Sequence, residues 1–584
     1  MLREDRFVTR LIVLFALFQL AAAGWDLPSS FGWENDGIAP RDLFGGLAFN
    51  LTPGQGHRYP LLHYLVVAVI SLPFLLLAVL RSESLNRAHL EQQVLAVDVM
   101  TGVSAVAKLL AIAAACISVL LLARMARRAF NRQDARWAAL WAVTCLSFTY
   151  YGRTSNLDGP YLMWTALSLS RLPDLLQRGR WRDYALFAVF AAASVATKDQ
   201  AYAAYALTCP LYLLLLPALL PRRFATGRAH WRRLLGALGV GAATLGLLGG
   251  GLLNPTGFVT RIRILTGGNT QDWSVYSRDL SGLLANLHDL GIGQLEWFWP
   301  WPLVGLAWMG VGIALRPHPL RHLRLLPITA GLSAILTFTL VVARSEHRFA
   351  LPLGFWLAFY GGAASDILCS SAASASARLL KGSDRAIAAR LLRLAVPLVL
   401  WSLLLLAGWR AAVLALTQWG DARRQVERYL LSVRPDTVVE TYGLLVYLPR
   451  FDTSAEAPYR VQHVGREQVV IPGVRRINDP YSLVSERNPD LLVIPEHYVE
   501  RYLPGTERSH RPASGRRREH RADREAVDFF RKVMADSLPG YRLVLAAGPR
   551  LPGWAVALGA EPIRIHGSTG MRMRVLERVA AAER

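Results

Sequence analysis

Long apolar stretches alternate with short polar segments over the first 420 residues of the chain. Because about 20 apolar residues are enough to cross a bilayer as a helix, this pattern predicts a polytopic α-helical membrane protein. From about Trp419 the pattern changes to shorter apolar runs separated by turn residues. Three of these runs are typical of buried strands (Val438–Leu448, Leu491–Ile494 and Arg542–Ala547), and Ala526–Met534 is typical of a helix. We therefore predict a transmembrane domain over 1–418 and a soluble α/β domain over 419–584.

The charge of the chain bears on membrane topology. A formal net charge of +23 would by itself suggest a nucleic-acid partner, but the mean hydropathy is +0.27 and the basic residues gather between apolar segments. Five short loops hold most of the excess: 124–136, 171–183, 221–233, 316–324 and 370–393. Such loops remain in the cytoplasm under the positive-inside rule. We therefore expect no nucleic-acid partner and place these five loops in the cytoplasm.

Residues 61–80 are the one apolar stretch that this topology does not allow to cross fully. The basic N-terminus and loop 124–136 both belong inside, which leaves room for only two crossings between them, 11–24 and about 99–123. We expect 61–80 to form a helix or a re-entrant hairpin on the outer side, bent by Pro60 and Pro73. The remaining crossings bring the total to eleven and place the C-terminus outside: 137–150, 160–170, 184–197, 201–220, 234–253, 297–315, 326–343, 349–369 and 394–409.

The first apolar segment also has features of a cleavable signal peptide, namely a basic start and the small residues Ala21–Gly24 at its end. Because a polytopic protein normally keeps its first span, we expect this segment to remain as an anchor.

This topology brings five polar segments to the outer face of the membrane. They are Glu34/Asp36, Asn156/Asp158, Lys198/Asp199, the loop 254–296 and Arg344/His347/Arg348. Each segment alone is compatible with an ordinary solvated or interfacial position. Together they predict one polar site that faces away from the cytoplasm.

The residue types in these segments suit group transfer from a phosphate. A carboxylate at a bilayer surface can accept a proton from an attacking hydroxyl, and we consider Asp36 first and Glu34 second for this role. Arginine suits phosphate oxygens because its planar fork donates two parallel hydrogen bonds. Lys108 lies inside an apolar run, where a charge is costly and often functional.

Five short motifs, in order over roughly residues 5–370, resemble the C-type polytopic glycosyltransferases that use polyprenyl-phosphate sugars. The resemblance is to protein O-mannosyltransferases and lipid A aminoarabinose transferases in particular. The motifs are Glu34-Asn35-Asp36, Tyr59-Pro60-Leu61-Leu62-His63-Tyr64-Leu65, Asn156-Leu157-Asp158-Gly159-Pro160, Thr197-Lys198-Asp199-Gln200 and His347-Arg348-Phe349-Ala350-Leu351-Pro352. Those families commonly show Asp-Glu in the first loop, whereas Gly37 follows Asp36 here. This departure leaves open which of Asp36 and Glu34 is the base.

The resemblance implies an inverting glycosyltransferase that moves a sugar from a polyprenyl-phosphate donor to an acceptor on the outer side. Two further sets of residues follow from it. The donor phosphate would be bound by Lys198, Arg344, His347, Arg348 and Lys108. The substrate would be bound, or the first loop ordered, by Asn156, Asp158, Tyr59 and His63. We expect no cofactor and no metal, although Glu34, Asp36 and Asp158 could supply some oxygen ligands to a hard cation.

Two other classes of function stay open on the sequence alone. One is a lipid or sugar transporter or flippase, although we see no matched halves with broken spans. The other is a non-catalytic envelope assembly factor whose outer domain is the active part. The Ala-, Leu- and Arg-rich composition is consistent with a bacterial inner membrane, with the N-terminus in the cytoplasm and the C-terminal domain in the periplasm. The sequence names neither the sugar nor the acceptor.

Overall fold

The computed structural model describes residues 5–56, 59–219, 227–266, 276–379, 386–454, 456–465, 473–503, 524–565 and 567–579. The chain divides into two compact units. Unit 1 contains Met1–Gly24 and Gly37–Ala411, and unit 2 contains Trp25–Asp36 and Ala412–Arg584. The change of composition near Trp419 therefore falls a few residues after the point where unit 2 resumes.

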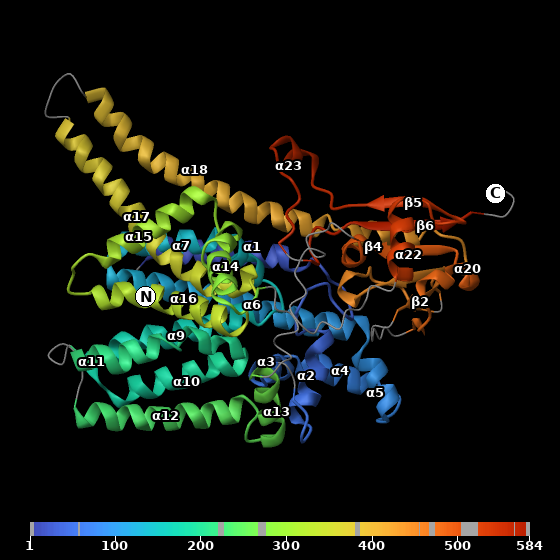
Figure 1. Ribbon diagram of the computed structural model, residues 1–584, viewed down its shortest axis with the longest axis horizontal. Helices are drawn as coiled ribbons and strands as arrows, with labels where there is room; N and C mark the ends of the chain where they lie inside the picture. The colour runs from blue at the N-terminus through green and yellow to red at the C-terminus, as the bar shows by residue number, and fades with distance from the viewer. Residues whose placement is uncertain are drawn as a thin grey trace. The chain divides into compact units, whose positions relative to one another are not determined.

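Over its described residues, unit 1 contains helices and connecting segments but no strand. Its helices, the last of which continues into unit 2, are α1 (Arg6–Ala23), α2 (Arg41–Leu51), α3 (Leu62–Ile70), α4 (Leu72–Arg81), α5 (Arg87–Val94), α6 (Val97–Ala129), α7 (Arg132–Val143), α8 (Leu146–Tyr151), α9 (Asp158–Arg178), α10 (Trp181–Thr197), α11 (Leu216–Leu219), α12 (Arg228–Leu248), α13 (Pro255–Thr266), α14 (Leu280–Gly291), α15 (Trp301–Leu315), α16 (Arg321–Val341), α17 (His347–Leu379) and α18 (Ala386–Trp419). Short 3-10 turns η1 (Asp199–Ala204) and η4 (Gly293–Trp297) and a π-helical turn η2 (Pro210–Leu215) join some of them. Figure 1 shows α9, α10 and α12 as three adjacent helices, with α10 packed against both of the others.

Four helical segments within the described residues are long and apolar enough to cross a membrane, which identifies an integral membrane protein. They are Arg6–Ala23, Val97–Ala129, Arg321–Val341 and Arg393–Leu430. The expected number of eleven crossings is therefore not confirmed. The other predicted crossings fall on helices that are shorter, interrupted or less apolar. For example, 137–150 is split between α7 and α8, and 201–220 contains the irregular turns η1 and η2.

The bend predicted in residues 61–80 is present. α3 and α4 meet at an angle of 60° across Ser71, and Pro73 lies in the first turn of α4. Proline fits a first helical turn because it needs no hydrogen-bond partner there, but it prevents α3 from continuing through it. The pair has the form of a broken span or a re-entrant segment, which would make a fifth candidate crossing if it counts as one.

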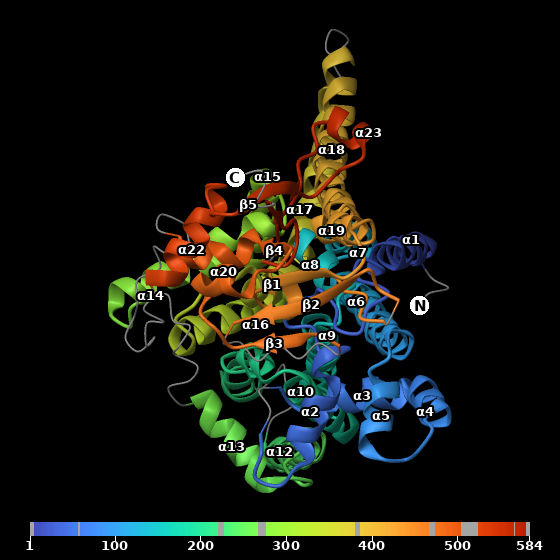
Figure 2. The ribbon, with the colours of Figure 1, turned by 90° about the vertical axis from the view of Figure 1, so that its right-hand side faces the viewer.

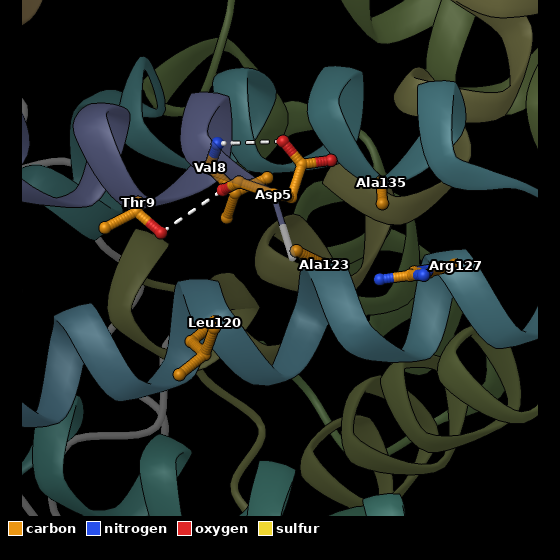
Figure 3. Close-up of a pocket in the computed structure, with 7 residues that line it drawn as sticks. All are labelled: Asp5, Val8, Thr9, Leu120, Ala123, Arg127 and Ala135. Atoms are coloured by element: carbon orange, nitrogen blue, oxygen red, sulfur yellow. Dashed lines mark hydrogen bonds between the residues drawn. The ribbon is translucent and has the colours of Figure 1, made fainter. Parts of the chain in front are cut away.

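The N-terminus of α1 is attached to the basic segment that begins α7. Asp5 caps α1 by accepting a hydrogen bond from the Phe7 N–H at 3.1 Å, and its carboxylate pairs with Arg132 at 2.9 Å and Arg136 at 3.1 Å. Figure 3 shows the small cavity beside this cap, between α1, α6 and α7. Its volume of about 20 Å³ is room for a single water molecule. The start of α1 and the loop 124–136 thus lie at the same end of unit 1, as the two-crossing prediction requires.

Unit 2 contains a six-stranded mixed sheet in the order β3-β2-β1-β4-β6-β5. The strands are β1 (Thr437–Tyr442), β2 (Tyr459–Val464), β3 (Arg475–Ile477), β4 (Leu491–Pro495), β5 (Tyr541–Ala547) and β6 (Met573–Arg578). β1, β2, β3 and β4 run parallel, whereas β6 is antiparallel to both β4 and β5. Figure 2 shows the sheet in orange and red. The predicted α/β character of the C-terminal region is confirmed.

The sheet is covered on both faces. Apolar residues of α19 (Ala422–Leu430) pack on one face with Val439, Val461 and Val493. Phe529, Phe530 and Val533 of α22 (Arg524–Met534) pack on the other with Leu492 and Ile494. A sheet buried on both sides has strands that are apolar at nearly every position, which is why Leu491–Ile494 was recognisable from sequence.

One predicted strand is shorter than expected. Residues 438–448 do not form a single strand, because β1 ends at Tyr442 and a 3-10 turn follows at Leu445–Tyr447. Gly443 causes the break: its φ of +102° is in the left-handed region, and a Cβ there would come within 2.8 Å of the Tyr498 ring. After the break, Leu445 and Leu448 pack with Trp25, Phe31 and Trp33, whereas Val446 and Tyr447 pack in the core of the sheet.

The segment Trp25–Asp36 belongs to unit 2 although it lies near the start of the chain. Trp25 and Trp33 pack with Leu445 and Leu448, and the Trp25 indole donates to Asp421 at 3.0 Å. The Arg423 guanidinium lies over both indole rings, 5.3 Å from that of Trp25 and 4.2 Å from that of Trp33. These buried aromatic and cation–π contacts explain why the first predicted outer loop is ordered with the C-terminal domain.

His463 of β2 is an unusual feature of this domain. Its ring is 1% exposed, and neither ring nitrogen has a hydrogen-bond partner within the described part of the chain. Burial lowers the pKa of His463 to about 4, and the positive charge of Arg476 acts in the same direction.

This burial predicts acid sensitivity. The ordinary histidine pKa is near 6.5, so the unfolded chain takes up a proton at His463 as the pH falls through 6.5, whereas the folded chain does so only near 4. Stability should be complete above pH 6.5 and should decrease by about 3 kcal/mol as the pH falls to about 4. The measurement is the unfolding temperature of the purified chain between pH 7.5 and 4.5. His463→Phe should flatten this slope, and His288→Phe, at an exposed histidine, should leave it unchanged. An unaltered slope in His463→Phe would show that another group is responsible.

Candidate active site

A buried ion pair joins two of the predicted site residues of unit 1, Lys198 and Asp158. Lys198 Nζ and Asp158 Oδ1 are 2.7 Å apart, and their side chains are 3% and 1% exposed. The Lys198 ammonium also lies 5.6 Å from the centre of the Tyr161 ring. Removing two charges from water to this depth costs much free energy, so both residues stay ionised only because they are paired.

The packing of α9 and α10 explains how residues 40 positions apart form this pair. α9 begins at Asp158 and ends at Arg178, and Gly179 after it takes the left-handed conformation of a helix C-cap. The chain then turns at once into α10, which packs back along α9 and ends at Thr197. The start of α9 and the end of α10 are therefore neighbours. Asp158 also lies in the first turn of its helix, where the helix dipole stabilises a carboxylate.

A second group of side chains surrounds His347, the first residue of α17. The Tyr151 hydroxyl and His347 Nε2 are hydrogen bonded at 2.9 Å, and the two rings are stacked with centroids 5.6 Å apart. The Trp297 ring lies 5.9 Å from the His347 ring. The Tyr151 hydroxyl is near enough to Asp158, Arg348 and Glu346 for their charges to affect it, so the two groups of side chains lie in the same region of unit 1.

Glu346 is a residue that the sequence analysis missed. It accepts from Arg344 Nε at 2.9 Å and pairs with Arg348 Nε at 2.7 Å, so one carboxylate lies between the two predicted phosphate ligands. Both guanidinium groups also lie over the Phe349 ring, at 5.2 and 5.0 Å. The signal in the sequence was the alternation of charges in Arg344-Ser345-Glu346-His347-Arg348.

Asp199, which directly follows Lys198 in the chain, is partly buried and pairs with the buried Arg261 at 3.7 Å. Arg261 is 2% exposed and donates to the Gly249 carbonyl at 3.0 Å. Burial raises the pKa of Asp199 to about 6, and Arg261 counteracts part of that rise. The sequence analysis placed Arg261 only in the loop 254–296, because nothing in its local sequence indicates burial.

The segment before α9 is buried as well. Arg153 is 1% exposed and donates to Gln19 of α1 at 3.3 Å, and Asn156 is 4% exposed. Ser155 receives the Ile38 N–H at its carbonyl at 3.2 Å and donates its hydroxyl to the Ala39 carbonyl at 3.0 Å. Residues 38–39 are thereby fixed to the segment that leads into Asp158.

Two predicted substrate-binding residues belong to the same region. Tyr59 packs on an apolar cluster that includes Leu157, the residue before Asp158. His63 of α3 is 6% exposed, and its neighbour Leu62 packs against Ala193 and Ala196 near the end of α10.

The other predicted site residues are Lys108, Glu34 and Asp36. Lys108 of α6 donates from Nζ to the Ala23 carbonyl at 2.8 Å, so it caps the last turn of α1. Glu34 and Asp36 belong to the segment of unit 2, where Glu34 is 5% exposed. Asp36 has a φ of 57°, a left-handed conformation that aspartate and asparagine tolerate better than most residues. Its side chain accepts from the Asn35 amide at 3.5 Å.

Within the described ranges, no group of three or more His, Cys, Asp or Glu residues is arranged to hold a metal ion. That the protein needs no metal stays a prediction.

Part of this site lies in a segment that is similar to a known protein family. Residues 93–243 match the family described as dolichyl-phosphate-mannose-protein mannosyltransferase, which is about a quarter of the chain. The matched segment includes Arg153, Asn156, Asp158, Lys198 and Asp199. A comparison with curated protein sequences gives no match.

Solved structures give weaker similarity. ArnT from Cupriavidus metallidurans in the apo state is 16% identical with a TM-score of 0.46, and the same protein bound to undecaprenyl phosphate is 16% identical with a TM-score of 0.47. Both alignments cover 83% of this chain and 93% of ArnT. The oligosaccharyltransferase AglB from Archaeoglobus fulgidus is 10% identical with a TM-score of 0.39, over 99% of this chain and 89% of AglB. The family match over 93–243 confirms that this chain resembles the polytopic membrane glycosyltransferases of the protein O-mannosyltransferase type.

Proposed function

We propose that this chain is an inverting membrane glycosyltransferase that moves a sugar from a polyprenyl-phosphate donor to an acceptor on the extracytoplasmic side. The observation that carries this proposal is the buried charged site around Lys198 and Asp158, which lies inside the segment that matches the mannosyltransferase family. Buried ionisable residues in a membrane protein are expensive and are usually retained for function. The undecaprenyl phosphate bound to ArnT and the dolichol-phosphate and peptide in the AglB complex support a lipid-phosphate donor.

The proposed reaction is a single displacement at the anomeric carbon. The acceptor hydroxyl attacks from the face opposite the phosphate, the bond from the anomeric carbon to the phosphate oxygen breaks, and the polyprenyl phosphate leaves with both bonding electrons. The acceptor proton passes to the base, for which we propose Asp36, with Glu34 as the alternative. One displacement inverts the configuration at the sugar.

The leaving phosphate gains negative charge in the transition state, and cations held in place beforehand stabilise that charge. Arg344, Arg348 and Lys198 are proposed for this role, with His347 held by Tyr151 at their side. Their carboxylate partners Glu346 and Asp158 offset two of these three positive charges before the donor binds, so one positive charge is left for the phosphate. Asn156, Tyr59 and His63 would line the same region. Lys108, which donates to the Ala23 carbonyl at the end of α1, stays a proposed ligand of the donor phosphate.

The direct test is sugar transfer by the purified chain in nanodiscs, with a panel of radiolabelled polyprenyl-phosphate sugars and a membrane extract as the source of acceptors. We expect label to move from one donor into the extract, with release of polyprenyl phosphate in equal amount. Folded protein that transfers from none of the donors, but moves labelled lipid across a bilayer, would instead indicate a transporter. Protein that does neither would indicate an assembly factor. Accessibility labelling in spheroplasts tests the proposed bacterial inner membrane and the outer position of the C-terminal domain.

A further inference from the structure

The turn that contains α23 (Gly553–Ala557) exposes large apolar side chains on unit 2. Trp554, Val556 and Leu558 are 57%, 56% and 67% exposed. Figures 1 and 2 show α23 standing off from the six-stranded sheet. Apolar side chains gathered in this way on a surface usually mark a protein or membrane contact.

The residues next to this turn indicate whether it contacts a protein or a membrane. Within unit 2, the Ile563 N–H donates to Thr417 Oγ1 at 3.1 Å, and the Arg550 N–H donates to the Gly420 carbonyl at 2.9 Å. Both acceptors lie at the end of α18, close to Trp419 and within the candidate membrane segment Arg393–Leu430. The sequence changes at Trp419 from apolar to charged, as it does where a helix leaves the hydrocarbon. The flanks of the turn are thus attached to the end of α18, where the sequence places the membrane surface.

A cavity of about 530 Å³ opens beside the turn. Residues on both flanks of the turn line it, including Glu561, and its other walls carry Glu496, Glu500, Arg564 and Arg572. β1 has β2 on one side and β4 on the other, so the order of the parallel strands reverses at the pair β1–β4. Ligands of open α/β sheets bind beyond the carboxyl ends of the strands at this reversal. Glu496 and Glu500 directly follow β4.

The ion pairs of the cavity show which charges remain for a ligand. Glu496 pairs with Arg574 at 2.9 Å, and Glu500 pairs with Arg564 at 3.1 Å. Over the described residues, the side chains of Arg572 and Glu561 make no hydrogen bond and no ion pair. Burial lowers the pKa of Arg564, and the positive charge of Arg572 contributes to the same effect. The cavity thus presents two nearby guanidinium groups and, on the flank of the turn, one available carboxylate.

We propose that this cavity binds the headgroup of a zwitterionic phospholipid, with its phosphate between Arg564 and Arg572 and its ammonium group at Glu561. The α23 turn inserts Trp554, Val556 and Leu558 into the same leaflet. Guanidinium groups suit phosphate oxygens, and aromatic and aliphatic side chains suit the boundary between headgroups and acyl chains. The carboxylate disfavours an anionic headgroup, which would bring a second negative charge to it. This assignment is independent of the glycosyltransferase activity.

The insertion of the turn is tested by photo-crosslinking the full chain in nanodiscs. Val556→p-benzoylphenylalanine should form lipid adducts that mass spectrometry detects. The same substitution at Arg460, which is 80% exposed on β2, should form none above background. Equal yields at the two positions, or none at Val556, would overturn the insertion.

The headgroup is tested by native mass spectrometry of lipid retention from nanodiscs that contain phosphatidylethanolamine or phosphatidylglycerol. Arg572→Gln should weaken retention of phosphatidylethanolamine about tenfold, the effect of losing one charge-assisted contact. Glu561→Gln should reduce the preference for phosphatidylethanolamine over phosphatidylglycerol. Arg460→Gln is the matched control for loss of an exposed arginine, and it should change neither. Retention that is the same in Arg572→Gln and the wild type, or a site that holds phosphatidylglycerol equally well, would overturn the proposed headgroup. Equal unfolding temperatures for all variants would confirm that they fold.

Discussion

Asp36→Asn should reduce sugar transfer by about 10²–10⁴-fold, the contribution of a general base to such reactions. The amide cannot accept the proton of the attacking hydroxyl. Asparagine is the matched replacement for a second reason, since Asp36 has a φ of 57° and asparagine also tolerates the left-handed region. The backbone should therefore keep its conformation, and the loss of transfer would report the loss of the carboxylate. The measurement is the initial rate of transfer from a radiolabelled donor at saturating acceptor.

Two further variants separate charge from backbone and Asp36 from Glu34. Asp36→Ala adds a cost of about 1–2 kcal/mol for alanine in the left-handed conformation, so its unfolding temperature should fall while that of Asp36→Asn does not. Glu34→Gln should leave most of the transfer if Asp36 is the base. Full activity in Asp36→Asn, together with loss in Glu34→Gln, would assign the base to Glu34. Full activity in both variants would remove this loop from the mechanism.

Lys198→Met and Asp158→Leu should each destabilise the folded protein by about 3–5 kcal/mol, because either change leaves one uncompensated charge in a buried position. The double variant should recover most of that loss, since two apolar side chains of similar size can replace a buried ion pair at little cost. The measurement is the unfolding temperature of all three variants in the same detergent.

The same variants test whether the pair has a function. If Lys198 stabilises the leaving phosphate, the double variant should fold but transfer sugar at least about 10²-fold more slowly, as other sites do when one preorganised donor is removed. Recovery of both stability and transfer would show that the pair is structural only. Single variants that are as stable as the wild type would contradict the burial of the pair.

Several helices and strands could be predicted from the sequence because the local pattern of apolar and polar residues determines them. Most of the apolar runs became helices or helix pairs, and the strand Leu491–Ile494 was found because a strand buried on both faces is apolar throughout. The bend between α3 and α4 follows from Pro73, whose ring prevents a helix from continuing. β2, β3 and β6 were missed. β2 and β6 carry polar residues at several positions, and β3 has only three residues.

The candidate site was predictable in part for the same reason. Asp158, Lys198, His347 and Arg348 stood out because charged residues at the ends of apolar runs are conspicuous. Arg261 and Arg153 did not, since their importance comes from burial and from partners distant in sequence. Glu346 was overlooked although its partners Arg344 and Arg348 are only two residues away. Lys108 was conspicuous as well, but its partner is the Ala23 carbonyl, which no local pattern could indicate.

The sequence by itself determined that this is a membrane protein with a C-terminal α/β domain, that it resembles polytopic glycosyltransferases, and which short motifs carry its charged residues. Hydrophobic periodicity and residue type are properties of neighbouring positions, so they can be read along the chain. Only the tertiary structure decided that Lys198 pairs with Asp158, that Glu346 lies between Arg344 and Arg348, and that residues 25–36 belong to the C-terminal unit. These pairings depend on how helices and strands pack, because a buried charge is stable only beside a partner that the fold brings to it.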